Sequence, residues 1–318
     1  MAKSILINKK INFFKKKTIY VEGDKSLSIR FILLSSLSNG KCIAKNLLKS
    51  EDVINTINCI KKLGIKIYFN KKNCEVYGKG LKGYDYRENI ILDAGNSGTA
   101  ARLLCASTID TTKYIKITGD ESLKKRDMKR ITEPLSKFGA KFKGNKKKLP
   151  LFIKGPKILK PISYNENLGS AQCKSAVMIA ALKTFGKTKI RCLPSRNHTE
   201  LLFQKVLKVP IKIKKNNRYE TIEINGLNEF NKFNYKIPGD ISSAAFFIVL
   251  VLLSKNSSLT IKDVNINPSR IGLIKILNKM IIIIWSNTML KATAMVCQIY
   301  MYYALRFIFT VIFYPRQK

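Results

Sequence analysis

Histidine is almost absent from this sequence, and acidic residues are scarce. The one histidine is His198, and none of the seven cysteines belongs to a Cys-x-x-Cys pair. Zinc sites need clusters of these two residue types, so we expect no metal site. We also expect no bound cofactor, and thiols that stay reduced in the cytoplasm. The N-terminus has no uninterrupted apolar stretch of the kind found in signal peptides, which argues against secretion.

The shortage of acidic residues leaves a formal net charge of +39, from 59 lysines and arginines against 20 aspartates and glutamates. Such a charge is typical of nucleic-acid-binding proteins, whose lysines and arginines neutralise backbone phosphates. It also arises from a sequence rich in Lys, Ile and Asn, in an enzyme with anionic ligands. Because the lysines are scattered and no aromatic-basic motif appears, we favour the enzyme and expect no nucleic acid as a partner.

Carboxylates are missing altogether after Met280. The stretch 281–314 is almost entirely apolar, and the segment from Thr293 to Tyr314, with Arg306 as its one charge, matches the length of a membrane span. A disruption of the reading frame near codon 280 explains both the apolar composition and the abrupt end of the Lys- and Asn-rich composition. We favour this second interpretation. Residues 281–318 are then an aberrant apolar tail, and no membrane is expected as a partner.

The most informative stretch that is present reads Gly95-Asn96-Ser97-Gly98-Thr99, followed by an apolar run to Ala106. Two glycines allow a tight turn and a close approach of a ligand to the backbone. Asn96, Ser97 or Thr99 can cap a helix that begins here. The N-terminus of such a helix presents unpaired N–H groups and the positive end of its dipole, which together attract an anion. The turn therefore predicts a binding site for phosphate.

The same pattern recurs at nearly constant spacing along the chain. Turns of this kind begin at Gly23, Gly95, Gly169 and Gly239, which are 72, 74 and 70 residues apart. A repeat of this length is too long for a solenoid unit and predicts a small α/β module with two helices and several strands. At 318 residues and 46% apolar, the chain is long enough to bury two cores. Each turn precedes an apolar helical run, and a second helical pattern follows at Asp52–Leu63, Met128–Phe138, Thr199–Leu207 and Arg270–Met280.

Seven motifs, read in order, resemble those of the 3-phosphoshikimate 1-carboxyvinyltransferase (EPSP synthase) family. Seven ordered motifs over residues 20–280 make the resemblance very specific. The forms of the fourth and fifth motifs look like the bacterial subgroup called class II. They also speak against the UDP-N-acetylglucosamine carboxyvinyltransferases, which share the fold. In this chain the motifs are GDKSLSIR at 23–30, LDAGNSGT at 92–99, GDESLKKR at 119–126, SAQCKS at 170–175, SRNHTE at 195–200, PGDISSA at 238–244 and NPSR at 267–270.

This resemblance implies an α/β (α+β) fold of two domains, the inverse α/β-prism, with the active site in the cleft between them. The implied division places the first strand of a lower domain in residues 1–20 and an upper domain of three βαβαββ repeats in residues 21–238. One partial lower-domain repeat would occupy residues 239–280, before the aberrant tail 281–318. Since each domain of the family has three repeats, the lower domain would be largely missing here.

The resemblance also implies the reaction. Enzymes of this family transfer the enolpyruvyl (carboxyvinyl) group of phosphoenolpyruvate to the 5-hydroxyl of shikimate 3-phosphate, on the shikimate pathway to chorismate and aromatic amino acids. Both substrates are polyanions, so the site needs fixed cations and oriented N–H donors. Matched motif by motif, Lys25 is the implied catalytic residue, which stabilises charge. The implied phosphoenolpyruvate ligands are Lys25, Asn96, Ser97, Gly98, Arg126 and Gln172, and the implied shikimate 3-phosphate ligands are Lys25, Ser26, Arg30, Ser170, Ala171, Gln172, Ser195 and Arg196.

Structural roles stay open for several charged and polar residues. Ser26 and Ser170 could be helix N-caps, and for Asp240 we favour that role. Arg102 and Arg130 have the positions of solvated or packed residues on helix faces.

Two more residues near the implied ligands stay ambiguous. His198 either lies near the shikimate 3-phosphate ligands or is packed at the start of a helix. Asp127 stands where the family usually has proline, and its carboxylate could weaken the field of Arg126.

The largest departure from the family concerns proton transfer. The implied acid–base pair, an aspartate and a glutamate of the lower domain, would follow Met280, where this chain has neither. General acid–base catalysis contributes roughly 100- to 10,000-fold, so we expect an inactive or impaired enzyme, and a monomer. The alternative is a non-catalytic basic protein that binds phosphate or nucleic acid and associates with membranes through its tail.

Glyphosate occupies the phosphoenolpyruvate site in this family, and a methyl group at the position of Gly98 crowds it out. The glycine therefore predicts sensitivity, whereas the class II-like motifs predict tolerance. Because steric exclusion acts directly at the site, we expect a full-length form to be sensitive.

Overall fold

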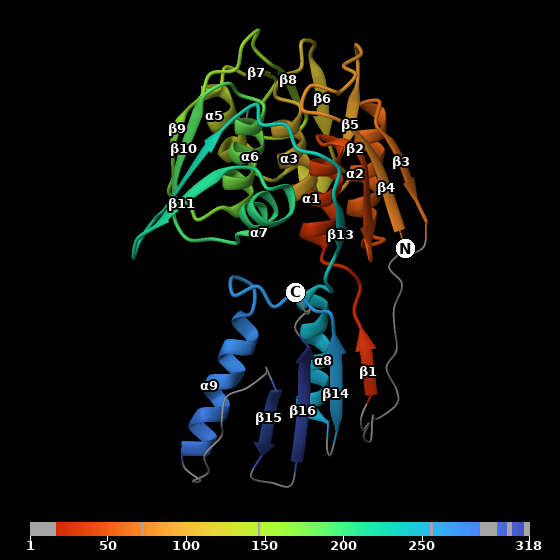
Figure 1. The fold of residues 1–318 in the computed structure, drawn as a ribbon, viewed down its shortest axis with the longest axis vertical. Helices are drawn as coiled ribbons and strands as arrows, with labels where there is room; N and C mark the ends of the chain where they lie inside the picture. Colours follow the sequence, from red (N-terminus) through yellow and green to blue (C-terminus); the bar gives the residue numbers. More distant parts are fainter. Residues whose placement is uncertain are drawn as a thin grey trace. The chain divides into compact units, whose positions relative to one another are not determined.

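The computed structural model describes residues 17–70, 73–145, 147–254, 257–286, 298–303 and 307–314, with side chains up to residue 279 (Figure 1). The chain divides into two compact units, Lys25–Ile237 and the combination of Met1–Asp24 with Pro238–Lys318. Each unit has its own cluster of buried apolar side chains.

The unit Lys25–Ile237 consists of three successive modules of two helical segments and several strands. The first contains α1 (Lys25–Ser36), β2 (Asn39–Lys45), α2 (Glu51–Lys62), β3 (Lys66–Phe69) and β4 (Asn73–Lys79). The second contains β5 (Ile91–Asp93), α3 (Gly98–Ser107), β6 (Ile115–Thr118), α4 (Glu121–Lys124), α5 (Lys129–Lys137), β7 (Lys141–Lys143) and β8 (Leu151–Lys154). The third contains β9 (Ser163–Glu166), α6 (Ala171–Leu182), β10 (Lys187–Cys192), α7 (His198–Leu201) with the π-helix Leu202–Leu207, β11 (Ile211–Lys215) and β12 (Glu220–Asn225).

The sheets of these modules share one strand order, β5-β6-β8-β7, β9-β10-β12-β11 and β13-β2-β4-β3. In each sheet the first two strands are parallel and the other pairs are antiparallel. The first module takes its first strand, β13 (Asn234–Lys236), from the end of the unit, where Asn234 pairs with Ile43. The predictions of a mixed α/β fold and of repeated α/β modules are thus confirmed.

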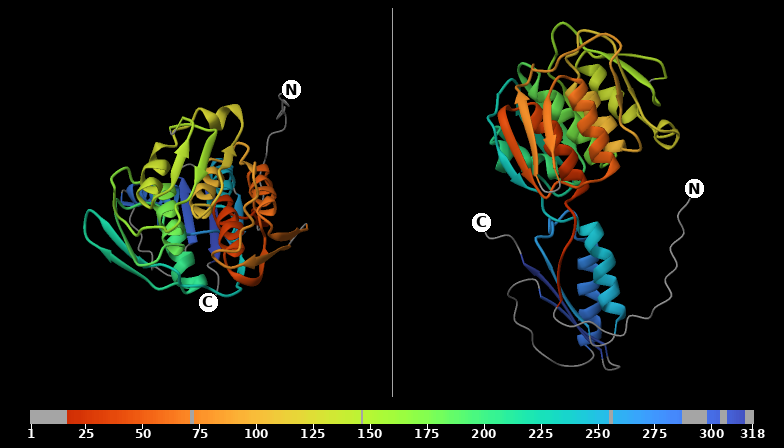
Figure 2. Two further views of the ribbon diagram at one scale, coloured as in Figure 1. Left: turned by 90° about the horizontal axis from the view of Figure 1, so that it is seen from above. Right: turned by 90° about the vertical axis from the view of Figure 1, so that its right-hand side faces the viewer.

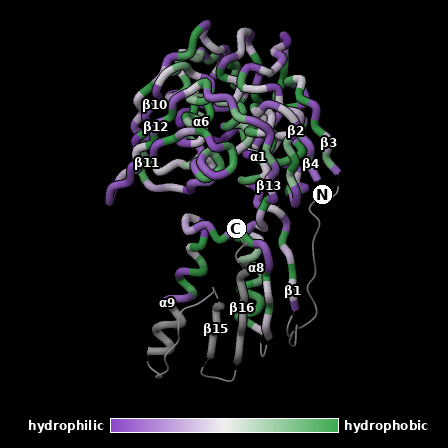
Figure 3. The backbone as a smooth tube through the Cα atoms, viewed as in Figure 1, coloured by the Kyte–Doolittle hydropathy of each residue, from purple (hydrophilic) through white to green (hydrophobic). Residues whose placement is uncertain are grey.

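Three helices form the centre of this unit because they are apolar on nearly all sides. Every residue of Leu27–Ser36 in α1 and of Cys173–Leu182 in α6 is buried, and in α3 every residue except Thr99. A helix that is hydrophobic all round must be covered on every face, and the strands and remaining helices provide that cover (Figures 2 and 3). The start of each central helix is one of the glycine-led turns that the sequence singled out.

The other unit follows the same plan as far as α9. It contains β1 (Lys17–Tyr20), α8 (Ile241–Leu253), β14 (Ser258–Lys262), α9 (Gly272–Ser286), β15 (Gln298–Tyr303) and β16 (Phe307–Tyr314), and its strand order is β1-β14-β16-β15. The first strand, β1, pairs in parallel with β14. However, β16 is also parallel to β14, whereas the corresponding strands of the other sheets are antiparallel. The repeat therefore departs from its pattern after α9.

Two interpretations of the C-terminal region need correction. The helix expected to end at Asn278–Met280 continues to Ser286, because no glycine or proline interrupts the isoleucines at 281–284. The stretch 293–314, considered as a membrane span, contains β15 and β16, and its other residues lie outside the described ones. No helix in the described ranges has the length and apolarity needed to cross a membrane. The frame disruption and the division of 239–318 at residue 280 remain predictions.

The separate cores generate a first prediction, that the fragment 25–237 folds on its own. A fragment that ends at residue 229 should melt at a temperature lower by more than about 6 °C, because it loses the buried Phe230 and Ile237 along with β13. This estimate takes about 1.5–3 kcal/mol for each side chain and about 2–4 °C for each kcal/mol. Thermal unfolding followed by circular dichroism tests both fragments. Equal melting temperatures, or the absence of a cooperative transition for 25–237, would contradict the prediction.

Burial also makes the thiols unreactive. All six cysteines with described side chains are buried and free. Burial raises the pKa of Cys105 and Cys173 to about 12, and that of Cys192 to about 11, from an ordinary value of 9.0. Since the thiolate is the nucleophile, iodoacetamide at pH 8 should label these residues only after unfolding. Mass mapping with and without urea measures this, and rapid labelling of Cys173 in the folded protein would contradict it.

A candidate anion-binding site at three helix starts

The turn before α3 has the geometry that its glycines predict. Gly95 has a φ of +56°, in the left-handed region that favours glycine, and a Cβ there would collide with Asn55. The Ser97 hydroxyl accepts a hydrogen bond from the Ala100 amide at 3.2 Å and is the N-cap of α3. The other amides at this helix start are therefore available to an anion in front of the turn.

A cavity of about 350 Å³ opens at this turn. Most of its lining comes from the starts of α1, α3 and α6, whose helix dipoles contribute positive potential, and the rest from the start of α2 and from the segment between α4 and α5. The cavity brings together every residue expected to bind phosphoenolpyruvate, and adds two that the sequence did not single out as ligands, Asp52 and Thr99. The lining residues are Lys25, Asp52, Asn96, Ser97, Gly98, Thr99, Arg126 and Gln172.

A chain of hydrogen bonds holds Arg126 at the cavity. Its Nη2 donates to Asn96 Oδ1 at 2.7 Å, and Asn96 Nδ2 donates to Asp120 Oδ2 at 2.6 Å. Asp120 is itself the N-cap of α4, where it accepts from the Leu123 amide at 2.7 Å. Both bonds lower the pKa of Asp120, and the bond from the Leu123 amide contributes more than the bond from Asn96. The ionised carboxylate fixes the orientation of the Asn96 amide, whose oxygen then faces Arg126.

Gln172 is fixed at both ends of its amide. Its Nε2 donates to Thr99 Oγ1 at 2.9 Å, and its Oε1 accepts from Arg102 Nη1 at 2.6 Å. Arg102 is only 8% exposed, and its Nη2 donates to the backbone carbonyl of Asp127 at 3.0 Å. Burial, followed by repulsion from Arg130 and Arg126, lowers the pKa of Arg102. A bound anion would relieve this repulsion.

Arg102 is thus a packed residue beneath the site, and not a solvated one. A positional signal for this existed in the sequence. Arg102 is four residues after Gly98, one helical turn after the amides at the helix start and on the same face of α3.

Lys25 lies at the first position of α1 and forms an ion pair with Asp52, with Nζ 2.9 Å from Oδ2. The Lys25 side chain is 52% exposed, so solvent screens this pair and leaves the ammonium accessible to a ligand. The sequence identified Asp52 only as a helix start. Its role beside Lys25 follows from the packing of α2 on α1, which no local pattern reveals.

Arg30 is buried between three helices. Its Nε donates to Thr199 Oγ1 at 2.8 Å and its Nη2 to Ser175 Oγ at 2.9 Å, while its Nη1 donates to the Ser26 carbonyl at 3.1 Å. The guanidinium therefore joins α1 to α6 and α7. Its expected role as a ligand of shikimate 3-phosphate remains a prediction.

The helix-cap interpretations have different outcomes. Ser170 is the N-cap of α6 and accepts from the Cys173 amide at 3.3 Å, and Asp240 is the N-cap of α8. Both interpretations are confirmed. Ser26 lies inside α1, after its first residue, so it is not an N-cap.

The remaining expected ligands surround the starts of α6 and α7. Ala171 is the first residue of α6 and is half-buried, and Arg196 is exposed two residues before α7. The Ser195 hydroxyl oxygen is buried, and among the described residues it has no hydrogen-bond partner. His198 is buried as the first residue of α7, as one of its two interpretations expects.

Asp127 directs its carboxylate toward Arg130, with Oδ2 3.8 Å from Nε. Its carboxylate therefore lies near Arg130, whereas the sequence suggested an effect on Arg126. Arg126 keeps its bond to the neutral oxygen of Asn96.

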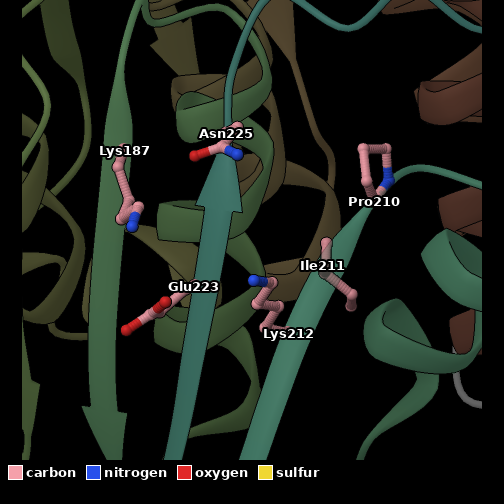
Figure 4. A pocket seen from close by; sticks show the side chains of 6 residues that line it. All are labelled: Lys187, Pro210, Ile211, Lys212, Glu223 and Asn225. Carbon is pink, nitrogen blue, oxygen red and sulfur yellow. The ribbon is translucent and has the colours of Figure 1, made fainter.

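A second hollow, of about 260 Å³, lies at strands β10, β12 and β11 (Figure 4). Lys187 pairs in register with Asn225, and Lys212 with Glu223. None of the expected ligands lines it, so the hollow at the helix starts is the better candidate.

Comparison with known proteins identifies the family of this chain. The sequence profile of the EPSP synthase (3-phosphoshikimate 1-carboxyvinyltransferase) family matches residues 15–294, which includes a stretch beyond Met280. A 3-phosphoshikimate 1-carboxyvinyltransferase of Thermoanaerobacter sp. (strain X514) is 43% identical over 270 residues, 84% of this chain and 62% of the relative. That of Ruthia magnifica subsp. Calyptogena magnifica is 42% identical over 261 residues, 82% of this chain and 59% of the relative.

The structure is similar to that of an EPSP synthase from Acinetobacter baumannii, with a TM-score of 0.76 and 33% identity over 85% of this chain and 60% of that one. This chain thus spans about three fifths of the length of the relatives that it matches. The alternative of a non-catalytic nucleic-acid-binding protein finds no support in these relatives. The chain belongs to the EPSP synthase family.

Proposed function

We propose that this chain binds phosphoenolpyruvate and shikimate 3-phosphate for the transfer of the enolpyruvyl group to the 5-hydroxyl of the latter. One observation carries the proposal within this family: cations and helix starts converge on the 350 Å³ cavity at Gly98. Lys25 and Arg126 would bind the carboxylate and phosphate of phosphoenolpyruvate, since a guanidinium matches either group bidentately. The amides at the start of α3 would hold the remaining phosphate oxygens.

The lining residues favour binding over proton transfer. They supply an ammonium, a guanidinium, hydroxyls and amides, whereas the carboxylate of Asp52 is paired with Lys25. Protonation of C3 of phosphoenolpyruvate would then require an acid outside this cavity. We therefore propose that the chain by itself binds both substrates and transfers the enolpyruvyl group weakly, as a cytoplasmic monomer.

Replacing Arg126 by methionine should weaken phosphoenolpyruvate binding about 10- to 100-fold, because a charged hydrogen bond contributes about 1.5–3 kcal/mol. Calorimetric titration in the presence of shikimate 3-phosphate measures this. The matched control is Lys124→Met. It removes a positive charge two residues before Arg126, from a side chain that forms an ion pair with Glu121. The control should bind within about twofold of the wild type. Equal losses for the two variants would mean that only net charge matters. A folded wild type that binds neither substrate would refute the proposed function.

Replacing Gly98 by alanine should weaken glyphosate binding more than phosphoenolpyruvate binding. The added Cβ would lie 2.9 Å from Arg102 Nη1 and 3.3 Å from Arg126 Nη1, so it presses on the guanidinium group of Arg126 in the cavity lining and on that of Arg102 beneath it. Parallel titrations of both ligands into wild type and variant, with shikimate 3-phosphate present, measure the difference. Identical losses for the two ligands would show that Gly98 does not set the size of the pocket.

A further inference from the structure

A buried ion pair, Lys174 with Glu200, lies in the interior of the unit Lys25–Ile237, beyond the cavity lining. Lys174 Nζ is 2.6 Å from Glu200 Oε1, and the exposed fractions of the two side chains are 0% and 4%. Glu220 Oε2 lies 3.6 Å from the same ammonium and 3.0 Å, through Oε1, from the more exposed Lys215. Lys174 and Glu200 therefore form the closest pair, and Glu220 lies between Lys174 and Lys215.

Such a pair is costly, since two ions lose their hydration when the chain folds. Apolar side chains of similar volume often stabilise a protein as well or better, so stability alone does not account for it. What an ion pair adds is a fixed distance between the elements that carry its charges. Here these elements are α6 and α7.

The neighbouring residues reinforce the same link. Ser175, next to Lys174, lies 2.7 Å from the hydroxyl of Thr199, next to Glu200. Arg30 donates to both hydroxyls. Two consecutive residues of α6 are thus fixed to two consecutive residues of α7.

The segments held by this link are those that carry the expected ligands of shikimate 3-phosphate. Lys174 comes two residues after Gln172 and four after Ser170, whose carbonyl accepts from the Lys174 amide at 3.0 Å. Glu200 comes five residues after Ser195, within the helix that directly follows that loop.

We propose that the Lys174–Glu200 ion pair positions the loop of Ser195 and Arg196 against the start of α6, and thereby sets the affinity for shikimate 3-phosphate. The choice of ligand rests on the proposed function. Both members are positioning residues, which act through Ser195 and Gln172 without touching the ligand.

The test uses a double variant of the full chain, Lys174→Met with Glu200→Met, that replaces the ion pair by apolar side chains of similar volume. It should melt at or above the wild-type temperature, because no unpaired buried charge remains. It should nevertheless bind shikimate 3-phosphate at least about tenfold more weakly, since small displacements of positioned groups are costly for binding. Calorimetric titration and thermal unfolding measure the two properties.

The matched control is the pair of Lys183 and Asp110, at the other end of α6. Its atoms are 2.7 Å apart, and the Lys183 side chain is 1% exposed. Asp110→Asn should lower the melting temperature and leave the affinity for shikimate 3-phosphate within about twofold. The single variant Glu200→Gln should lower both.

Two results would overturn the proposal. One is a folded double variant that binds as tightly as the wild type. The other is a loss of affinity in Asp110→Asn as large as in Glu200→Gln, which would make both effects consequences of stability.

A wild type that is folded but does not bind shikimate 3-phosphate would instead refute the proposed function. In that case amide hydrogen exchange without ligand decides the positioning role. The amides of residues 195–197 should exchange faster in the double variant than in the wild type, and at the wild-type rate in Asp110→Asn. Unchanged exchange in the double variant would then reject the positioning role as well.

Discussion

The need to bury three helices that are apolar on nearly every side determines the rest of the unit Lys25–Ile237. Since α1, α3 and α6 expose almost no surface along their length, polar groups can reach a ligand only at their ends. At the N-terminal ends, amides lack intrahelical partners and need caps or anions. Ser97 and Ser170 cap two of these helices, and the cavity lies where the starts of all three meet. The packing that forms the core therefore also creates the site.

The treatment of charge differs between the core and the cavity. Buried Lys174 and Lys183 each have a carboxylate oxygen within 2.7 Å, so their charges are compensated inside the protein. Arg102 and Arg126 donate instead to a glutamine, an asparagine and a backbone carbonyl, which are neutral. These bonds fix the guanidinium groups without placing a carboxylate in direct contact with them. An anion in the cavity would be attracted by both groups, and its binding, which we propose, would relate part of the high positive charge to a small ligand.

Much of the fold and of the site could be predicted from the sequence because both depend on local patterns. The glycine turn predicted a helix cap at Asn96, Ser97 or Thr99, of which Ser97 is the cap, and the spacing of the turns predicted repeated modules. What escaped prediction depends on contacts between distant segments: the pairing of Asp52 with Lys25 and of Lys174 with Glu200 joins different helices. The direction of β16 and the end of α9 were also unpredictable, since the repeat pattern stops at that point of the sequence.

The strands β1 and β13 connect the two units in sequence. Each is the first strand of a sheet, yet each precedes in sequence the central helix of the other unit: β1 comes before α1 and pairs with β14, while β13 comes before α8 and pairs with β2. Each unit thus has one sheet whose first strand is distant in sequence from the strand that it pairs with. The glycine turns at Gly23 and Gly239, which pair with each other, stand where the chain passes between units. At Gly239 a Cβ would lie 2.6 Å from Val21 Cγ2, so the close approach of the two crossings favours glycine at this position. The glycine turn at Gly239 therefore has a role in the fold, and Asp240, which follows it, is the N-cap of α8.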